Sequence, residues 1–206
     1  MDRDSFFSSW SNLHGGAEIS GFVRGWLKIS FFLVKPLAKA RISPNLLTFL
    51  GLFFAILVWG SPKSWAAFLF LFISLVFDGI DGSLAIIRKV TSNQGAVIDS
   101  VADRLSEVFW ALALVRLGAN ATLIFVIVLF AFTQEYLRAR AAGLGQRGIE
   151  IVTIAERPVR AILIMIALLA WHFNENLSTS IVYLWLAIQT IGLFQVTRAL
   201  AKNLSK

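Results

Sequence analysis

The chain of 206 residues has no cysteine and only two histidines, His14 and His172. Without cysteine it can form neither a disulfide nor a thiolate metal site. The two histidines lie far apart in the sequence and cannot build a histidine-rich metal site alone. Charged residues make up only 15% of the chain, whereas soluble domains carry about 25%. Because 57% of the residues are hydrophobic, the composition indicates a membrane protein.

Patterns that would point to other protein classes are also absent from the sequence. No zinc-finger, RRM or helix-turn-helix pattern accompanies the net charge of +7, so we expect no nucleic-acid partner. Residues 1–17 are polar and of mixed charge, without the basic start and short apolar run of a removable signal peptide. In a membrane chain, an excess of Lys and Arg more often sets orientation.

Six apolar runs are long enough to form transmembrane helices. A helix needs about 20 residues, within a range of about 17 to 25, to cross roughly 30 Å of hydrocarbon. Pro44 suits the first turn of the first helix, and turn signals at Ser61-Pro62 and Gly118-Ala119-Asn120 separate later runs. The sequence therefore predicts an all-α integral membrane protein with six spans. These are residues 44–61, 64–88, 94–117, 120–142, 157–173 and 178–200.

The segment ahead of the first span, residues 19–40, has apolar residues at helical spacing with basic residues between them. This pattern predicts an N-terminal amphipathic helix lying in the headgroup layer, although another buried helix of the bundle would also fit. The chain would then comprise a polar segment at 1–18, the juxtamembrane helix at 19–40 and a six-helix transmembrane domain at 41–206. The apolar residues are Phe22, Trp26, Ile29, Leu33 and Leu37, and the basic ones are Arg24, Lys28, Lys35 and Lys39.

Basic residues are distributed unevenly between the two ends of the predicted spans. With six spans both termini share one side, and the opposite side has only Lys63 and Arg116. The positive-inside rule makes the terminal side cytoplasmic, and we expect a multi-pass protein of the plasma membrane. The basic residues of the terminal side are Arg24, Lys28, Lys35, Lys39, Arg41, Arg88, Lys89, Arg138, Arg140, Arg147, Arg157, Arg160, Arg198, Lys202 and Lys206.

Four aspartates lie near the cytoplasmic ends of the second and third predicted spans. Asp78 and Asp81 are three residues apart, and Asp99 and Asp103 are four apart, so each pair shares one face of its helix. The short loop at 88–93 makes the two helices antiparallel neighbours, so the acidic faces can converge. Ionisable groups at such depth are costly and usually mark function.

Converging carboxylates cannot all stay ionised in a poorly hydrated cavity without cations. Mg²⁺ fits well, because it prefers carboxylates combined with substrate phosphates. Two such ions about 4 Å apart could clamp a pyrophosphate, and Mn²⁺ could replace Mg²⁺. Two other interpretations remain. The aspartates could pair with Arg88 and Arg104 and only orient helices, or they could serve a cation or proton-coupled transporter.

The segment from Asp78 to Asp103 reads DGIDGSLAIIRKVTSNQGAVIDSVAD. It resembles the signature of the CDP-alcohol phosphotransferase family, D-x-x-D-G-x-x-A-R followed after a short gap by G-x-x-x-D-x-x-x-D. The predicted spans and the amphipathic helix extend the resemblance over most of the chain. The matching residues are Asp78, Asp81, Gly82, Ala85, Gly95, Asp99 and Asp103.

The resemblance implies a transferase with two metal ions. Asp78, Asp81 and Asp99 would hold the metals, and Asp103 would complete the second site. Asp103 would also act as the general base on the acceptor hydroxyl, which attacks the β-phosphate of CDP-diacylglycerol and releases CMP. The resemblance further implies a set of CDP-lipid contacts, comprising Asn45, Thr48, Gly82, Ala85, Ser92 and Gly95.

One position departs from the family pattern. Ile86 stands where the signature has an arginine that would help to hold the donor's diphosphate. Arg88 and Lys89 follow closely, although their side chains point in other directions from the helix. A non-catalytic relative that binds a nucleotide lipid is therefore a third hypothesis, beside the enzyme and the transporter.

A second group of basic residues resembles one branch of the family, the phosphatidylinositol phosphate synthases. Arginines suit a phosphorylated, anionic acceptor. Arg138 ends the fourth span, and the E-R-P-x-R turn contains Arg157 and Arg160. Arg198 lies late in the sixth span. The resemblance implies transfer to inositol phosphate and a homodimer, although glycerol 3-phosphate would also suit a basic pocket.

Overall fold

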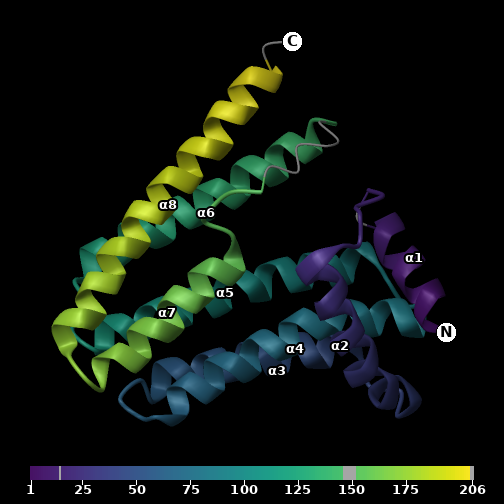
Figure 1. Ribbon diagram of the computed structural model, residues 1–206, viewed down its shortest axis with the longest axis horizontal. Helices are drawn as coiled ribbons and strands as arrows, with labels where there is room; N and C mark the ends of the chain where they lie inside the picture. Colours follow the sequence, from purple (N-terminus) through teal and green to yellow (C-terminus); the bar gives the residue numbers. More distant parts are fainter. Residues whose placement is uncertain (14, 146–151, 205–206) are drawn as a thin grey trace. The chain divides into compact units, whose positions relative to one another are not determined.

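The computed structural model describes residues 1–13, 15–145 and 152–204, and every regular element in these ranges is an α-helix (Figure 1). His14, Arg147 and Lys206 lie outside the described residues. The helices are α1 (Arg3–Leu13), α2 (Gly21–Lys39), α3 (Pro44–Gly60), α4 (Ala66–Arg88), α5 (Asn93–Arg116), α6 (Ala121–Gly143), α7 (Arg157–Trp171) and α8 (Glu175–Leu204).

Each predicted span coincides with one helix from α3 to α8, because the apolar runs end at residues that stop or start helices. Pro44 begins α3, where its missing N–H is not needed. The side chain of Asn120 caps α6 by accepting a hydrogen bond of 3.0 Å from the Leu123 N–H. The largest difference is at α8, which begins at Glu175 and runs to Leu204 rather than over residues 178–200.

Three helices of the described chain are each long and apolar enough to cross a membrane. They are α4, α6 and the Glu175–Lys202 part of α8, and α2 and α3 would add a fourth span if this bent pair is counted as one. α7 has only 15 residues, a length of about 22 Å, and α5 contains several charged residues. These apolar helices make the protein a membrane protein, while the count of six spans stays a prediction.

The chain divides into two compact units, residues 1–54 with 72–106, and residues 55–71 with 107–206. In the first unit, a core of Val34, Leu47, Ile80 and Leu84 joins α2, α3 and α4. The Ser74 hydroxyl on α4 donates a hydrogen bond of 2.7 Å to the Gly51 carbonyl of α3.

α2 is fastened to α4 at a glycine. The indole N–H of Trp26 donates to the Gly79 carbonyl at 3.3 Å. A Cβ added at Gly79 would lie 2.5 Å from the Trp26 ring, closer than side-chain carbons approach one another. The absence of a side chain at 79 therefore allows α2 to pack on the turn of α4 that follows Asp78.

α1 forms within the segment that the sequence predicts only as polar. Its Phe6 is fully buried in a cluster with Leu27 of α2 and Ile86 of α4. Phe6 also packs on the ring of Phe31, with centroids 5.5 Å apart. The isoleucine at the departure from the family signature is therefore part of the hydrophobic core, with 5% of its surface exposed.

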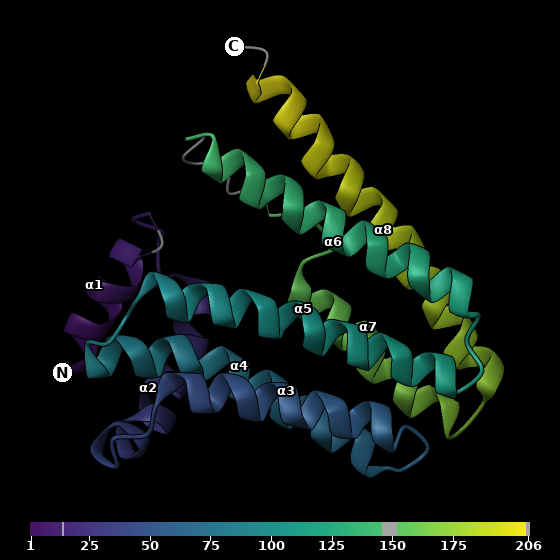
Figure 2. The same ribbon diagram turned by 180° about the vertical axis from the view of Figure 1, so that it is seen from behind.

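In the second unit, α8 packs against both α6 and α7, as Figures 1 and 2 show from opposite sides. Two buried glutamines link α6 to α8, because the Gln189 amide donates to the Gln134 carbonyl oxygen at 3.0 Å. Gly192 lets the segment before α7 approach α8, since a Cβ at Gly192 would collide with Ala155.

The Phe6–Leu27–Ile86 cluster predicts that Ile86→Arg destabilises the protein. A buried charge without a partner costs roughly 3–5 kcal/mol, whereas the control Ile86→Val should cost only about 1 kcal/mol. Thermal unfolding of both variants in detergent micelles measures the difference. An Ile86→Arg protein that is as stable as the wild type and turns over faster would contradict this packing role.

Candidate active site

Three of the four predicted aspartates come together in the first unit. Asp78 of α4 and Asp99 and Asp103 of α5 each offer a carboxylate oxygen, and these oxygens lie within 4.8 Å of one another. All three residues are half-buried. The spacing of three and four residues within each helix, together with the short α4–α5 connection, accounts for this arrangement.

Asp81 makes different contacts from the other three. Its residue is 4% exposed, and its carboxylate accepts a hydrogen bond of 2.5 Å from the Thr48 hydroxyl and one of 2.5 Å from the Gly82 N–H. Asp99 and Asp78 act on it as like charges. The carboxylate is thus held beside the acidic group by Thr48, which lies one turn after the start of α3.

The donor set fits a hard divalent cation. Carboxylate oxygens are the ligands that Mg²⁺ and Ca²⁺ prefer, and three of them within 4.8 Å repel one another unless a cation or protons compensate. Arg104, whose guanidinium lies 3.7 Å from the Asp103 carboxylate, offsets part of this charge. The geometry of Asp78, Asp99 and Asp103 therefore fits a divalent metal site.

Three of the predicted CDP-lipid contacts lie together beside the start of α5. The Gly95 N–H donates to the Ser92 hydroxyl at 3.0 Å. A Cβ at Gly95 would lie 3.2 Å from that hydroxyl and 3.8 Å from the side-chain oxygen of Asn45. Gly82 is exposed with no heavy atom near its missing side chain, and Ala85 is half-buried. These small residues leave the backbone accessible to a ligand.

Arg88 does not take the place of the signature arginine. Its guanidinium donates to the Ile42 carbonyl at 2.6 Å and so connects the end of α4 to the α2–α3 connection. Lys89 is exposed and has a positive φ of 55°.

In the second unit, Arg160 is fully buried in a network of oxygen acceptors. Its guanidinium pairs with both oxygens of Glu107, lies 3.3 Å from Glu135, and donates to the Ala155 carbonyl at 2.5 Å. A buried arginine needs such partners to compensate for lost hydration. These contacts fix the first turn of α7 against α5 and α6.

Arg138 forms a second ion pair in this unit. Its two terminal nitrogens donate to the two oxygens of Glu156, at 3.0 and 2.5 Å. Glu156 also accepts from the N–H and the hydroxyl of Thr153, at 2.6 and 2.8 Å. Burial favours the neutral acid, but the bonds from Arg138 and Thr153 outweigh it and lower the pKa of Glu156 below its ordinary value.

The remaining two predicted arginines differ in their surroundings. Arg157 is half-buried, and its guanidinium lies 5.5 Å from the ring centroid of Trp110. Arg198 is exposed on α8. The second unit therefore contains Arg138, Arg157 and Arg160 around the start of α7, and carboxylates hold Arg138 and Arg160.

Sequence reasoning missed the carboxylates that hold these arginines. Glu107 is fully buried and pairs with Arg160 across 53 positions of sequence. Glu107 follows Asp99 and Asp103 at the same spacing of four residues on α5. This spacing indicates that Glu107 shares the helix face of the two aspartates. Glu135 lies three residues before Arg138, at ion-pair spacing, 3.7 Å from its guanidinium.

Comparison with known proteins agrees with the motif and the fold. A family model described as CDP-alcohol phosphatidyltransferase matches residues 41–193. A protein of Aquifex aeolicus is 35% identical over 131 residues, which are 57% of this chain and 64% of that protein. Phosphatidylinositol phosphate synthase of Cutibacterium acnes is 28% identical over 156 residues, covering 66% of this chain and 72% of the relative.

A solved structure shares the fold. The crystal structure of Mycobacterium tuberculosis phosphatidylinositol phosphate synthase, solved with CDP-DAG bound, matches with a TM-score of 0.70. The match covers 84% of this chain and 93% of that one at 21% identity. The chain spans just under two thirds of the Aquifex relative, and the family match extends over most of its own length. The protein belongs to the CDP-alcohol phosphatidyltransferase family.

Proposed function

We propose that the protein transfers a phosphatidyl group from CDP-diacylglycerol to a small phosphorylated polyol, inositol phosphate, and releases CMP. The gathering of Asp78, Asp99 and Asp103 carries this proposal, because such a group of carboxylates suits a metal-assisted reaction at a diphosphate. The relative from Cutibacterium acnes and the Mycobacterium tuberculosis structure, both phosphatidylinositol phosphate synthases, support the choice of acceptor.

The reaction needs one proton transfer and one exchange of P–O bonds. An acceptor hydroxyl gives its proton to the Asp103 carboxylate while its oxygen attacks the β-phosphorus of CDP-diacylglycerol. A new P–O bond joins the acceptor to the phosphatidyl group, and the bond to the CMP phosphate breaks. CMP leaves with the electron pair of that bond. Asp103 is half-buried, and the Arg104 guanidinium lies 3.7 Å from its carboxylate.

Four aspartates would hold the metals. The ligands of two Mg²⁺ ions, or of Mn²⁺ in their place, would come from Asp78, Asp81 and Asp99, and Asp103 would complete the second site. When bound, the ions neutralise the diphosphate and the charge that develops on the leaving CMP. The hydrogen bonds that Asp81 accepts from Thr48 and Gly82 would hold its carboxylate in place for this task.

The donor nucleotide would lie over the small residues of the first unit. We propose Asn45, Thr48, Gly82, Ala85, Ser92 and Gly95 as its contacts. The proximity of Ser92, Gly95 and Asn45 to one another supports this set. Because Ile86 is buried in the core with Phe6, the donor diphosphate would depend on the metals rather than on the signature arginine.

The proposed site for the acceptor phosphate comprises four arginines, some as positioning residues and some as direct phosphate ligands. They are Arg138, Arg157, Arg160 and Arg198. The contacts of Arg160 with Glu107, Glu135 and Ala155 make it a positioning residue that fixes the start of α7. The bidentate pair with Glu156 gives Arg138 a similar part. Arg157, at the first position of α7, and the exposed Arg198 are the proposed direct phosphate ligands.

The membrane arrangement extends the proposal. We propose six spans with α2 in the headgroup layer, and the division into segments 1–18, 19–40 and 41–206. Both termini and the aspartates would face the cytoplasm from the plasma membrane, in a homodimer. The excess of Lys and Arg on the terminal side supports this orientation.

Asp103→Asn should lower turnover about a hundredfold to ten-thousandfold, because it removes the proposed general base. CMP release from CDP-diacylglycerol with Mg²⁺ and inositol phosphate measures it in lipid vesicles, and Asp4→Asn on the exposed face of α1 is the control. Parallel reactions with glycerol 3-phosphate decide the acceptor. Full turnover by Asp103→Asn would contradict the mechanism.

Arg157→Gln should raise the KM for the acceptor about tenfold to a hundredfold, because a hydrogen-bonded charge contributes roughly 1.5–3 kcal/mol. The KM for CDP-diacylglycerol should not change. Arg140→Gln, an exposed arginine of α6, is the matched control. An unchanged acceptor KM in the Arg157 variant would remove this residue from the acceptor site.

Glu156→Gln should lower the unfolding temperature at neutral pH, where the ionised carboxylate holds Arg138. Because the pKa of Glu156 is lowered in the folded protein, its contribution is complete above its ordinary value of 4.5 and is lost as the pH falls through the depressed folded value. The difference in unfolding temperature between Glu156→Gln and the wild type should therefore become smaller below pH 4.5. In a protein that already carries Arg138→Gln, Glu156→Gln should lower the unfolding temperature only slightly. An equally large decrease there would show that Glu156 does not stabilise the protein through Arg138.

A further inference from the structure

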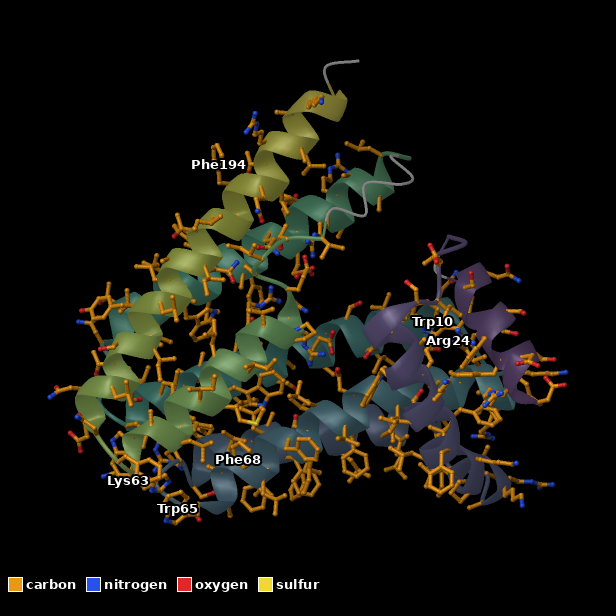
Figure 3. All side chains as sticks on the ribbon, in the orientation of Figure 1. Trp10, Arg24, Lys63, Trp65, Phe68 and Phe194 are labelled. Atoms are coloured by element: carbon orange, nitrogen blue, oxygen red, sulfur yellow. The ribbon has the colours of Figure 1, made fainter. Side chains whose placement is uncertain are left out.

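A cavity lies at the turn between α3 and α4 within the second unit, and none of its lining residues is used in the proposed function. Its volume is about 280 Å³. Figure 3 labels Lys63 and Trp65 at this turn. The cavity is lined by Gly60, Ser61, Pro62, Lys63, Ser64 and Arg116. Two of these six residues are cations and none is acidic, which favours an anionic occupant.

The charge of Arg116 is held in place by the end of α3. Its Nη1 donates to the carbonyls of Trp59 and Gly60, at 2.5 and 3.1 Å, and the guanidinium lies 5.8 Å from the Trp59 ring centroid. The residue is exposed, and its Nε and Nη2 donate to no other residue in the described part of the chain. A fixed guanidinium with donors to spare suits an oxyanion.

Lys63 supplies the second charge. It is exposed, and its ammonium lies 5.9 Å from the ring centroid of Trp171. The positive-inside pattern leaves Lys63 and Arg116 as the two basic residues at this end of the predicted spans. Both of them line the same cavity, so the two positive charges at this end of the predicted spans lie close together.

The surroundings of the cavity are those of a membrane–water interface. α4, which is long and apolar enough to span a membrane, begins three residues after Lys63. The exposed Trp65 stacks on His172 with centroids 4.0 Å apart and meets Phe173 edge-on. Trp residues gather at the headgroup level of membranes, which supports a position of this turn near lipid phosphates.

We propose that this cavity binds the phosphate of an anionic phospholipid, with Lys63 and Arg116 as its two charged ligands. The volume accommodates a phosphodiester with a few waters, because each water occupies about 30 Å³. The aromatic rings at the turn would pack beside the glycerol and upper acyl carbons. Free phosphate offers the same oxyanion, but it lacks the apolar chains that would keep it at this depth.

Binding is measured by native mass spectrometry and by thermal unfolding of the full chain in phosphatidylcholine nanodiscs, with and without phosphatidylglycerol. We expect phosphatidylglycerol to raise the unfolding temperature of the wild type. Lys63→Gln should bind it about fivefold more weakly, which corresponds to about 1 kcal/mol for one interfacial charge. Arg140→Gln, which removes an exposed charge of α6 away from the cavity, should bind like the wild type.

Arg116→Gln and Arg116→Lys separate lipid binding from the contact with α3. The first should unfold at a lower temperature even in pure phosphatidylcholine, because it loses the bonds to Trp59 and Gly60. Arg116→Lys keeps the charge and should retain most of the affinity for phosphatidylglycerol. Equal binding of phosphatidylglycerol by Lys63→Gln and the wild type would overturn the proposal. If inorganic phosphate raised the unfolding temperature as much as phosphatidylglycerol does, the phosphate bound in the cavity would not need to come from a lipid, and the lipid part of the proposal would be wrong.

Discussion

Mutual repulsion among three carboxylates is the constraint on which the first unit depends. Oxygens of Asp78, Asp99 and Asp103 within 4.8 Å of one another are unfavourable in a half-buried setting unless positive charge compensates. Helix packing must therefore hold α4 and α5 together against this force. The core of α2, α3 and α4 fixes α4 on its side of the group, and the Thr48 hydroxyl holds the fourth carboxylate beside the other three. A cation placed among the carboxylates would relieve this repulsion.

The two units meet the cost of buried charge in opposite ways. The first gathers the carboxylates of Asp78, Asp99 and Asp103 at one place, with Arg104 beside Asp103. The second pairs its buried charges internally, Arg160 with Glu107 and Glu135, and Arg138 with Glu156. Internal pairing fixes side chains before any ligand arrives, which reduces the entropy lost on binding. Because these pairs hold the start of α7 in place, Arg157 could contact a ligand without a rearrangement of the helix.

Much of this arrangement follows from local rules that the sequence reveals. Apolar runs and turn residues predict the helices from α3 to α8, and spacing within α4 and α5 predicts that the aspartates converge. The sequence does not predict α1, because a single buried side chain, that of Phe6, holds an otherwise polar segment against the core. The pairing of Arg160 with Glu107 is not predicted either, because it joins residues 53 positions apart, and no local pattern sets such a distance. Ile86 departs from the signature, and only its neighbours Phe6 and Leu27 explain why a hydrophobic residue fits there.

The contact between Trp26 and Gly79 joins two positions that cannot vary separately. Any side chain at 79 would meet the indole at once, and any loss of the indole would leave the Gly79 carbonyl without its 3.3 Å donor. A chimera that exchanges the N-terminal helices between relatives must therefore carry both residues across together. If it does not, we expect α2 to separate from the turn of α4 that begins at Asp78.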